Sequence, residues 1–230
     1  VTFWSLGNES GAGSNHRAAA AYVRGFDPTR PVHYEGAIRG NWTANFDLSD
    51  VVCPMYPAIG AIENYAKAIK SGKRKTETSR PLIMCEYTHA MGNSNGTLKE
   101  YWDVIHKYKG LQGGFIWEMW DHGLDQTLPD GTKRSAYGGN YGEKKHDGNF
   151  VCDGMFFPDR TPKPAMAEFK YLAAPVFITR KGARTSAKFE IFNKFFFKDL
   201  SGYKLRYEVT VNGAIAHRGN LKLPAVKPRK

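Results

Sequence analysis

The sequence predicts an α/β domain followed by a separate antiparallel β-domain, and two patterns support this prediction. In residues 1–175, short apolar runs alternate with segments of helical periodicity, as expected for parallel strands buried on both faces. From residue 176 to residue 230, apolar and polar residues alternate one by one, which is typical of half-buried antiparallel strands. We therefore divide the chain into a first domain of residues 1–175 and a second of residues 176–230.

The first domain contains five candidate strands, which begin near residues 2, 31, 51, 82 and 114, at spacings of 29, 20, 31 and 32 residues. A repeat of about 30 residues per strand–helix unit is the rhythm of a (β/α)8 TIM barrel, so five units predict a partial barrel. A doubly wound open sheet would also explain the alternation, but no glycine-rich phosphate-binding motif follows the first strand. The expected strands are residues 2–6, 31–34, 51–56, 82–87 and 114–120, and the expected helices are residues 15–25, 62–71 and 97–108.

The second domain is expected to be part of an antiparallel β-sandwich. Its candidate strands are residues 187–193, 203–212 and 215–220, with Asn212-Gly213 as a hairpin signal. The net charge of +11 is concentrated here, because residues 180–230 hold 13 Lys or Arg and three Asp or Glu. These basic residues alternate with apolar ones and form no single stripe, so we predict no nucleic-acid partner.

Several other classes of protein are also disfavoured. No apolar run approaches the roughly 20 residues of a membrane-spanning helix, so no membrane partner is predicted. Three cysteines (Cys53, Cys85 and Cys152) lack metal-binding spacing and are expected to be buried thiols. The chain opens on a strand pattern without an initiator Met or signal peptide, so we interpret it as a fragment that is inactive alone. We expect a cytoplasmic location, with periplasmic or secreted locations left open.

Glutamates stand at the ends of three of the five candidate strands, namely Glu9, Glu35 and Glu86. In a barrel, functional residues gather at the carboxyl ends of the strands. Two carboxyl groups at one barrel mouth are the minimum apparatus for cleaving a glycosidic bond, since one must donate a proton while the other attacks carbon 1 or activates water. A single such glutamate could equally form a structural salt bridge, so the neighbouring residues matter.

Three of these neighbours fit a sugar site. Trp117 ends the last strand, and an aromatic face stacks on the apolar face of a sugar ring. His89 lies on the polar loop that follows Glu86, where groups that recognise hydroxyls are expected. Tyr56 ends the preceding strand and could hydrogen-bond Glu86, keeping it ionised and oriented.

The strings around these residues closely resemble the two active-site signatures of family 2 β-galactosidases. They are Trp4-Ser5-Leu6-Gly7-Asn8-Glu9-Ser10 and Cys85-Glu86-Tyr87-Thr88-His89-Ala90-Met91-Gly92-Asn93-Ser94. Residues 53–56, 111–117 and 136–139 and the motif Asp159-Arg160-Thr161-Pro162-Lys163-Pro164 are similar too. The likeness runs to about residue 175 and implies the second half of the catalytic barrel, about strands 4 to 8. Beyond it, only the position of the family's following β-sandwich matches.

The resemblance implies a role for each matching residue. Glu9 would be the general acid/base and a ligand of Mg²⁺, whose other ligands lie upstream of this sequence. Asn8 would bind the sugar 2-hydroxyl, and Glu86 would be the nucleophile. Tyr56 would support Glu86, His89 would bind galactose and Trp117 would lie under the sugar. Phe150 and Asp153 align with the family's Na⁺-binding segment, although Asp153 replaces the usual asparagine.

The resemblance thus implies a glycoside hydrolase that removes terminal β-D-galactose from β-galactosides such as lactose, with retention. Retention predicts that the Glu9 and Glu86 carboxyl groups lie about 5–5.5 Å apart, against about 6.5–9.5 Å for inversion. A β-glucuronidase-like specificity and a non-catalytic carbohydrate-binding fragment are the alternatives. An oligomeric full-length enzyme is left open.

Overall fold

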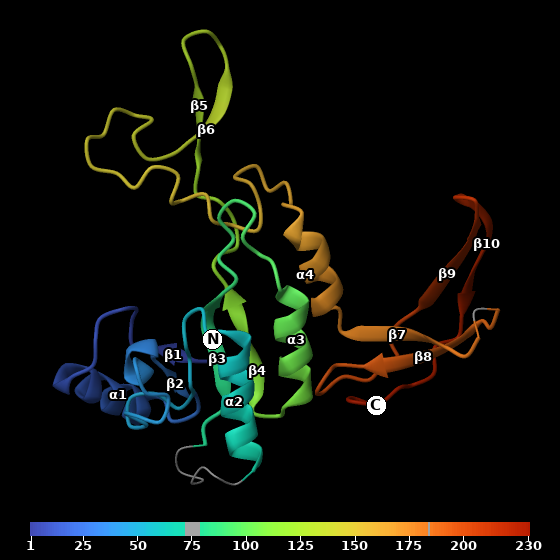
Figure 1. The fold of residues 1–230 in the computed structure, drawn as a ribbon, viewed down its shortest axis with the longest axis horizontal. Helices are drawn as coiled ribbons and strands as arrows, with labels where there is room; N and C mark the ends of the chain where they lie inside the picture. The colour runs from blue at the N-terminus through green and yellow to red at the C-terminus, as the bar shows by residue number, and fades with distance from the viewer. Residues whose placement is uncertain (72–78, 184) are drawn as a thin grey trace. The chain divides into compact units, whose positions relative to one another are not determined.

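The computed structural model describes residues 1–71, 79–183 and 185–230 (Figure 1). The chain divides into two compact units, Val1–Leu172 and Ala173–Lys230. This division falls three residues before the boundary expected from the sequence. The predicted active-site residues all belong to the first unit.

The first unit contains a set of neighbouring parallel strands. Strand β1 pairs in parallel with β2, and β3 pairs in parallel with β4. Leu82 and Met84, on one face of β3, are fully buried, and Ile83 and Cys85, on the other face, are partly buried, which fits a strand with neither face open to solvent. These strands are β1 (Trp4–Ser5), β2 (Val32–His33), β3 (Leu82–Tyr87) and β4 (Leu111–Ile116).

The expected strand at residues 51–56 lies between β2 and β3 but does not form a continuous ladder. Two isolated parallel bridges join it to β3, and the Asp50 N–H donates to the carbonyl of Val32 in β2 at 2.8 Å. Pro54 lies in the middle of the segment and has no N–H to donate, which explains the interruption. The strand order β1, β2, residues 51–56, β3, β4 agrees with a partial barrel, and the described strands leave the sheet open.

Helices α1 (Ser14–Phe26), α2 (Ile59–Lys70) and α3 (Leu98–Lys107) lie within three residues of their predicted starts and ends. Helix α3 packs on β4 and on α2, and in Figure 1 both helices lie beside β3 and β4. The core that joins helices and sheet is apolar and closely packed; its fully buried members include Tyr34, Leu48, Ile62, Leu82, Met84, Tyr87 and Leu98. None of the helices in the described residues is long and apolar enough to cross a membrane.

The prediction of a strand over residues 114–120 was wrong at both ends. Strand β4 begins at Leu111 and stops at Ile116, because residues 117–122 leave the sheet and bond to residues 151–156. Four further elements were not predicted from the sequence. A 3-10 turn at Glu35–Ile38 precedes β3; the hairpin of β5 (Leu124–Thr127) and β6 (Lys133–Ala136) and the helix α4 (Ala165–Ala173) follow β4.

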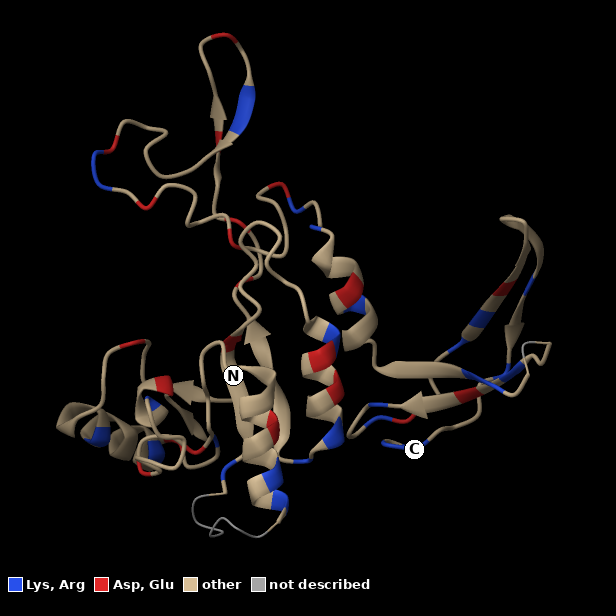
Figure 2. Cartoon of the chain, viewed as in Figure 1, with Lys and Arg blue, Asp and Glu red and all other residues tan. Residues whose placement is uncertain are grey.

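The second unit consists of two antiparallel hairpins, β7 (Val176–Lys181) with β8 (Lys188–Asn193) and β9 (Leu205–Val211) with β10 (Ala214–Leu221). Asn212 and Gly213 connect β9 to β10 with φ values of 50° and 85°, as the expected two-residue turn requires. Strand β7 was not among the predicted strands. Figure 2 shows Lys and Arg distributed over both hairpins.

The expectation of buried thiols yields the first testable prediction. Cys53 is fully buried, and burial raises the pKa of its thiol to about 11. Only about one Cys53 side chain in a thousand would therefore be a thiolate at pH 8, and this fraction rises as the pH approaches 11. We expect iodoacetamide at pH 8 to leave Cys53 unmodified in the folded protein, while partly exposed Cys152 reacts first.

Mass spectrometry of tryptic peptides would measure this difference. As a control, all three cysteines should react at similar rates in urea. Equal modification of Cys53 and Cys152 in the folded protein would contradict the burial of Cys53.

Candidate active site

The carboxyl end of β3 carries Glu86, which is half-buried beside the fully buried Tyr87. The Tyr56 N–H donates to the Glu86 carbonyl at 2.9 Å, so the end of residues 51–56 is fixed to the end of β3. Burial raises the pKa of Tyr56, and its hydrogen bond to the Glu86 side chain raises it further. The Tyr56 hydroxyl therefore stays protonated at neutral pH and can donate to the Glu86 carboxylate.

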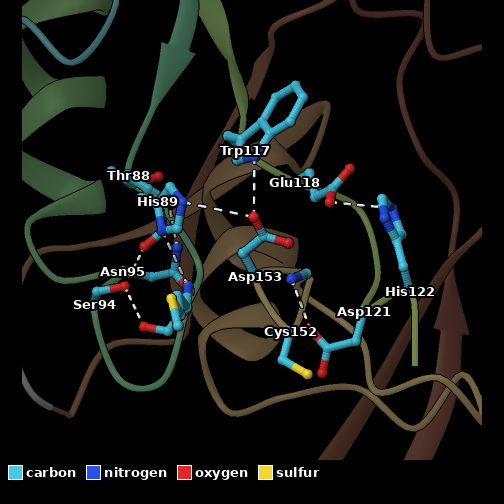
Figure 3. Close-up of polar contacts among 12 residues, drawn as sticks. Thr88, His89, Ser94, Asn95, Trp117, Glu118, Asp121, His122, Cys152 and Asp153 are labelled. Atoms are coloured by element: carbon cyan, nitrogen blue, oxygen red, sulfur yellow. Dashed lines mark hydrogen bonds and ion pairs between the residues drawn. The ribbon is translucent and has the colours of Figure 1, made fainter. Parts of the chain in front are cut away.

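His89, Trp117 and Asp153 form a second group (Figure 3). The Trp117 indole N–H donates to Asp153 Oδ2 at 3.1 Å, and His89 Nε2 lies 3.6 Å from the same oxygen. His89 Nδ1 accepts a hydrogen bond from the Met91 N–H at 3.4 Å, which favours the tautomer with its proton on Nε2, facing Asp153. Asp153 thus holds both the histidine and the tryptophan that were predicted to bind sugar.

The loop after Glu86 is fixed by its own polar side chains. The Asn95 amide donates to the Thr88 carbonyl at 2.5 Å, and the Ser94 hydroxyl donates to the carbonyls of His89 and Met91. Figure 3 shows these residues folding back beside His89. The Ala90 N–H also donates to the Trp117 carbonyl at 2.8 Å, so the loop is fixed both by its own side chains and by the residue that follows β4.

Aromatic rings link the two groups into one cluster. The His89 ring centroid lies 6.0 Å from that of Tyr56 and 5.7 Å from that of Phe150. Phe150 is exposed, and the Trp117 ring is 39% exposed, so both aromatic faces are available to a ligand. Glu86, its partner Tyr56 and this cluster therefore lie together at the carboxyl ends of β3, β4 and residues 51–56.

Glu118 adds a further carboxyl group to this cluster, and the sequence analysis gave it no role. Its Oε1 lies 3.1 Å from His122 Nε2, and its backbone N–H donates to the Asp153 carbonyl at 2.8 Å. Burial and the neighbouring Asp153 carboxyl raise the pKa of Glu118, while His122 opposes this shift. Glu118 directly follows Trp117 in the chain, and this is the only sequence signal that could have placed its carboxyl group near Asp153.

Asn8 and Glu9 follow β1, which β2 and residues 51–56 separate from β3, and both are exposed. Glu9 has a positive φ of 49°, and its N–H donates to the side chain of Glu35. Glu9 and Glu35 also line a cavity of about 250 Å³ whose wall includes Cys53, Pro54 and Met55. Within the described residues, no hydrogen bond or ion pair joins Glu9 to Glu86. Glu35 was noted as a strand-end residue without a role, and here it contacts Glu9 directly.

The two expected metal sites differ in how well these residues fit them. Asp153 Oδ1 is buried with no hydrogen-bond partner, so a cation near Phe150 and Asp153 would satisfy an otherwise unpaired oxygen. Glu9 and Glu35 supply two carboxyl groups, but the described residues contain no cluster of three or more His, Cys, Asp or Glu side chains suited to a metal. The donors around Glu9 therefore do not by themselves make a complete Mg²⁺ site.

Residues 1–178 match the family model described as "Glycosyl hydrolases family 2, TIM barrel domain", more than half of the chain. The chain belongs to glycoside hydrolase family 2. Residues 189–230 match a second model, described as "Beta-galactosidase, domain 4". The partial barrel predicted from strand spacing and the family inferred from the motifs are both confirmed.

Curated relatives and solved structures extend the comparison. A β-galactosidase of Photobacterium profundum is 39% identical over 97% of this chain, and one of an Arthrobacter species is 40% identical over 96%. The chain spans 22% of the length of each. A β-glucuronidase structure from Ruminococcus gnavus aligns with 74% of this chain at 20% identity, with a TM-score of 0.49. The aligned part is 31% of the β-glucuronidase chain. A family 2 β-galacturonidase structure from Eisenbergiella tayi has a TM-score of 0.48 at 15% identity, covering 74% of this chain and 33% of that one.

Proposed function

We propose that this chain supplies the two catalytic carboxyl groups of a retaining β-galactosidase, which removes terminal β-D-galactose from substrates such as lactose. The observation that carries the proposal is the cluster at the carboxyl end of β3. There, the Tyr56 N–H donates to the carbonyl of the half-buried Glu86, the Tyr56 ring lies 6.0 Å from that of His89, and Asp153 contacts both His89 and Trp117. The β-galactosidases with 37–40% identity to this chain favour galactose over a β-glucuronidase-like specificity.

In this proposal Glu86 attacks carbon 1 of the galactose and forms a covalent galactosyl-enzyme. Glu9 first gives its proton to the departing glycosidic oxygen and then takes a proton from the water that releases the sugar. Tyr56 orients the Glu86 carboxylate by donating its hydroxyl hydrogen bond. Asn8 binds the 2-hydroxyl, His89 binds a further sugar hydroxyl, and the exposed Trp117 ring lies under the apolar face of the hexose.

The strand order sets a geometric condition on this mechanism. Glu9 follows β1 and Glu86 ends β3, so three strand spacings separate them. At about 4.8 Å per spacing, that is about 14 Å along a flat sheet. Only the curvature of a closed barrel brings the two carboxyl groups to the separation of about 5–5.5 Å that retention requires. We propose that the barrel closes in the full-length protein and sets this separation.

The remaining expectations are also part of the proposal. Glu9 would contribute to a Mg²⁺ site with residues outside this sequence, and Phe150 and Asp153 would hold Na⁺. Such cations would supply fixed positive charge beside the sugar. We further propose a cytoplasmic enzyme without nucleic-acid or membrane partners, able to form oligomers as the full-length protein.

A trapping experiment tests the proposed function. A 2-deoxy-2-fluoro-β-galactoside with a good leaving group should inactivate the full-length protein, because the fluorine slows hydrolysis of the galactosyl-enzyme. Peptide mass spectrometry should then find the sugar on Glu86. A label on Glu9, Glu35 or any other residue would refute the assignment, and inactivation by the glucuronide analogue alone would favour the rival specificity.

A further inference from the structure

The motif Asp159-Arg160-Thr161-Pro162-Lys163-Pro164 has no role in the proposed mechanism, yet it folds into a tight reverse turn. Asp159 Oδ1 accepts a hydrogen bond from the Thr161 N–H at 2.8 Å. The Phe157 N–H donates to the Thr161 carbonyl, and the Arg160 N–H donates to the Phe157 carbonyl, both at 2.9 Å. The turn thereby folds residues 161–163 back along residues 155–157, which are bonded in turn to residues 117–122.

Two cationic side chains of this turn contact residues 120 and 121. Lys163 Nζ lies 2.7 Å from Asp121 Oδ1, and the two side chains are only 9% and 5% exposed. The Arg160 guanidinium lies over the Trp120 ring, 4.4 Å from its centroid. A buried ion pair constrains its two partners strongly, because breaking it leaves one charge without compensation.

Asp121 also holds the segment that carries Asp153. Its Oδ1 accepts the Gly154 N–H at 2.8 Å, next to Asp153 in the chain (Figure 3). The Glu118 N–H donates to the Asp153 carbonyl at 2.8 Å, and the Met155 N–H donates to the Glu118 carbonyl at 2.9 Å. The segment of residues 117–122 and the segment of residues 151–156 are therefore joined along their length, with the Lys163–Asp121 pair at one end.

We propose that Lys163 and Arg160 are positioning residues of the galactose site, acting through these two segments on Trp117 and Asp153. The inference rests on the proposed function, since it concerns how tightly that site binds sugar. Neither cation belongs to the predicted active-site cluster. In the proposed function Trp117 contacts the sugar ring rather than the bond that breaks, so loosening residues 117–122 and 151–156 should weaken sugar binding more than it slows the chemical step.

The first test replaces both members of the buried pair in the full-length protein. In the double variant Asp121→Asn/Lys163→Met, Asn keeps an acceptor for the Gly154 N–H and Met keeps the bulk of the lysine stem, so no unpaired charge is buried. We expect KM for nitrophenyl β-galactoside and the inhibition constant of galactose to rise about tenfold or more, with kcat changing less. The matched control is Lys99→Met, which breaks the exposed Lys99–Asp103 pair on α3 and should leave both constants unchanged.

Two further variants separate positioning from a merely structural role. Lys163→Arg keeps a cation for Asp121 and should restore KM to within about threefold of the parent. Arg160→Gln removes the cation that lies over the Trp120 ring and should also raise KM. Because Arg160 is exposed, this substitution alters no buried side chain, so it tests the proposal even if the double variant does not fold. Lower thermal stability with unchanged KM in both the double variant and Arg160→Gln would overturn the proposal. Failure of the proposed function would show separately, as a parent protein that does not hydrolyse the galactoside.

Discussion

Replacing Glu86 by Gln is expected to abolish turnover while leaving galactose binding in place. The amide has nearly the same shape and can still accept the hydrogen bond of the Tyr56 hydroxyl, but it cannot attack carbon 1. We expect kcat to fall by at least about a thousandfold, because no covalent intermediate can form. Steady-state kinetics of the full-length protein would measure the loss, and calorimetric titration with galactose would show that binding persists.

A matched control and a rescue sharpen this prediction. Glu100→Gln changes an exposed glutamate on α3 and should leave kcat unaltered. In Glu86→Gly, azide can enter the space left by the side chain and form a bond to carbon 1 as the leaving group departs. The product should be α-galactosyl azide, because a single displacement inverts the configuration. If Glu86→Gln kept substantial turnover, or if azide gave only the β-product, Glu86 would not be the nucleophile.

The placement of Glu86 at the carboxyl end of a buried strand could be predicted because its signals are local. The apolar run of residues 82–87 is long enough to define β3, and the residue at its carboxyl end faces the barrel mouth whatever the rest of the chain does. Helix α3 was predicted for the same reason, since its apolar residues recur at helical spacing and its buried Leu98 and Ile105 pack into the core. Glu86, Tyr56 and His89 follow from these placements.

The contacts that hold Trp117 and His89 could not be predicted, because they are non-local. Residues 117–120 belong to the expected strand, yet residues 118–122 leave β4 to bond with residues 151–156, which are 29 to 37 positions away. No short-range period encodes such a pairing. The unexpected ties of Asp121 to Lys163 and to Gly154 are of this kind. Pro54 differs from these cases because its effect is local. Its missing N–H interrupts the strand at residues 51–56, and this interruption can be predicted from the sequence alone.

Replacing Gly154 by Ala is expected to disrupt the pairing of residues 118–122 with residues 151–156, which holds Asp153. A Cβ at this position would lie 2.0 Å from the Trp120 carbonyl carbon and 2.1 Å from the Trp120 Cα, both backbone atoms that no rotamer change can move away. Ordinary overpacking of a core costs about 1–3 kcal/mol, and a clash between two backbones should exceed the upper end of that range. We expect the free energy of unfolding to fall by at least about 3 kcal/mol, and galactose binding to be lost with it.

The matched substitution is Gly25→Ala in α1, where a Cβ would meet no atom within 4 Å. Alanine is favoured over glycine inside a helix, so this variant should be more stable by about 0.5–1 kcal/mol. Urea unfolding of both variants in the full-length protein, followed by tryptophan fluorescence, measures the two effects with opposite signs. A Gly154→Ala variant as stable as its parent would show that residues 120 and 154 are not packed backbone to backbone. The pairing of residues 118–122 with residues 151–156, through which Lys163 and Arg160 are proposed to act on Asp153, would then be absent.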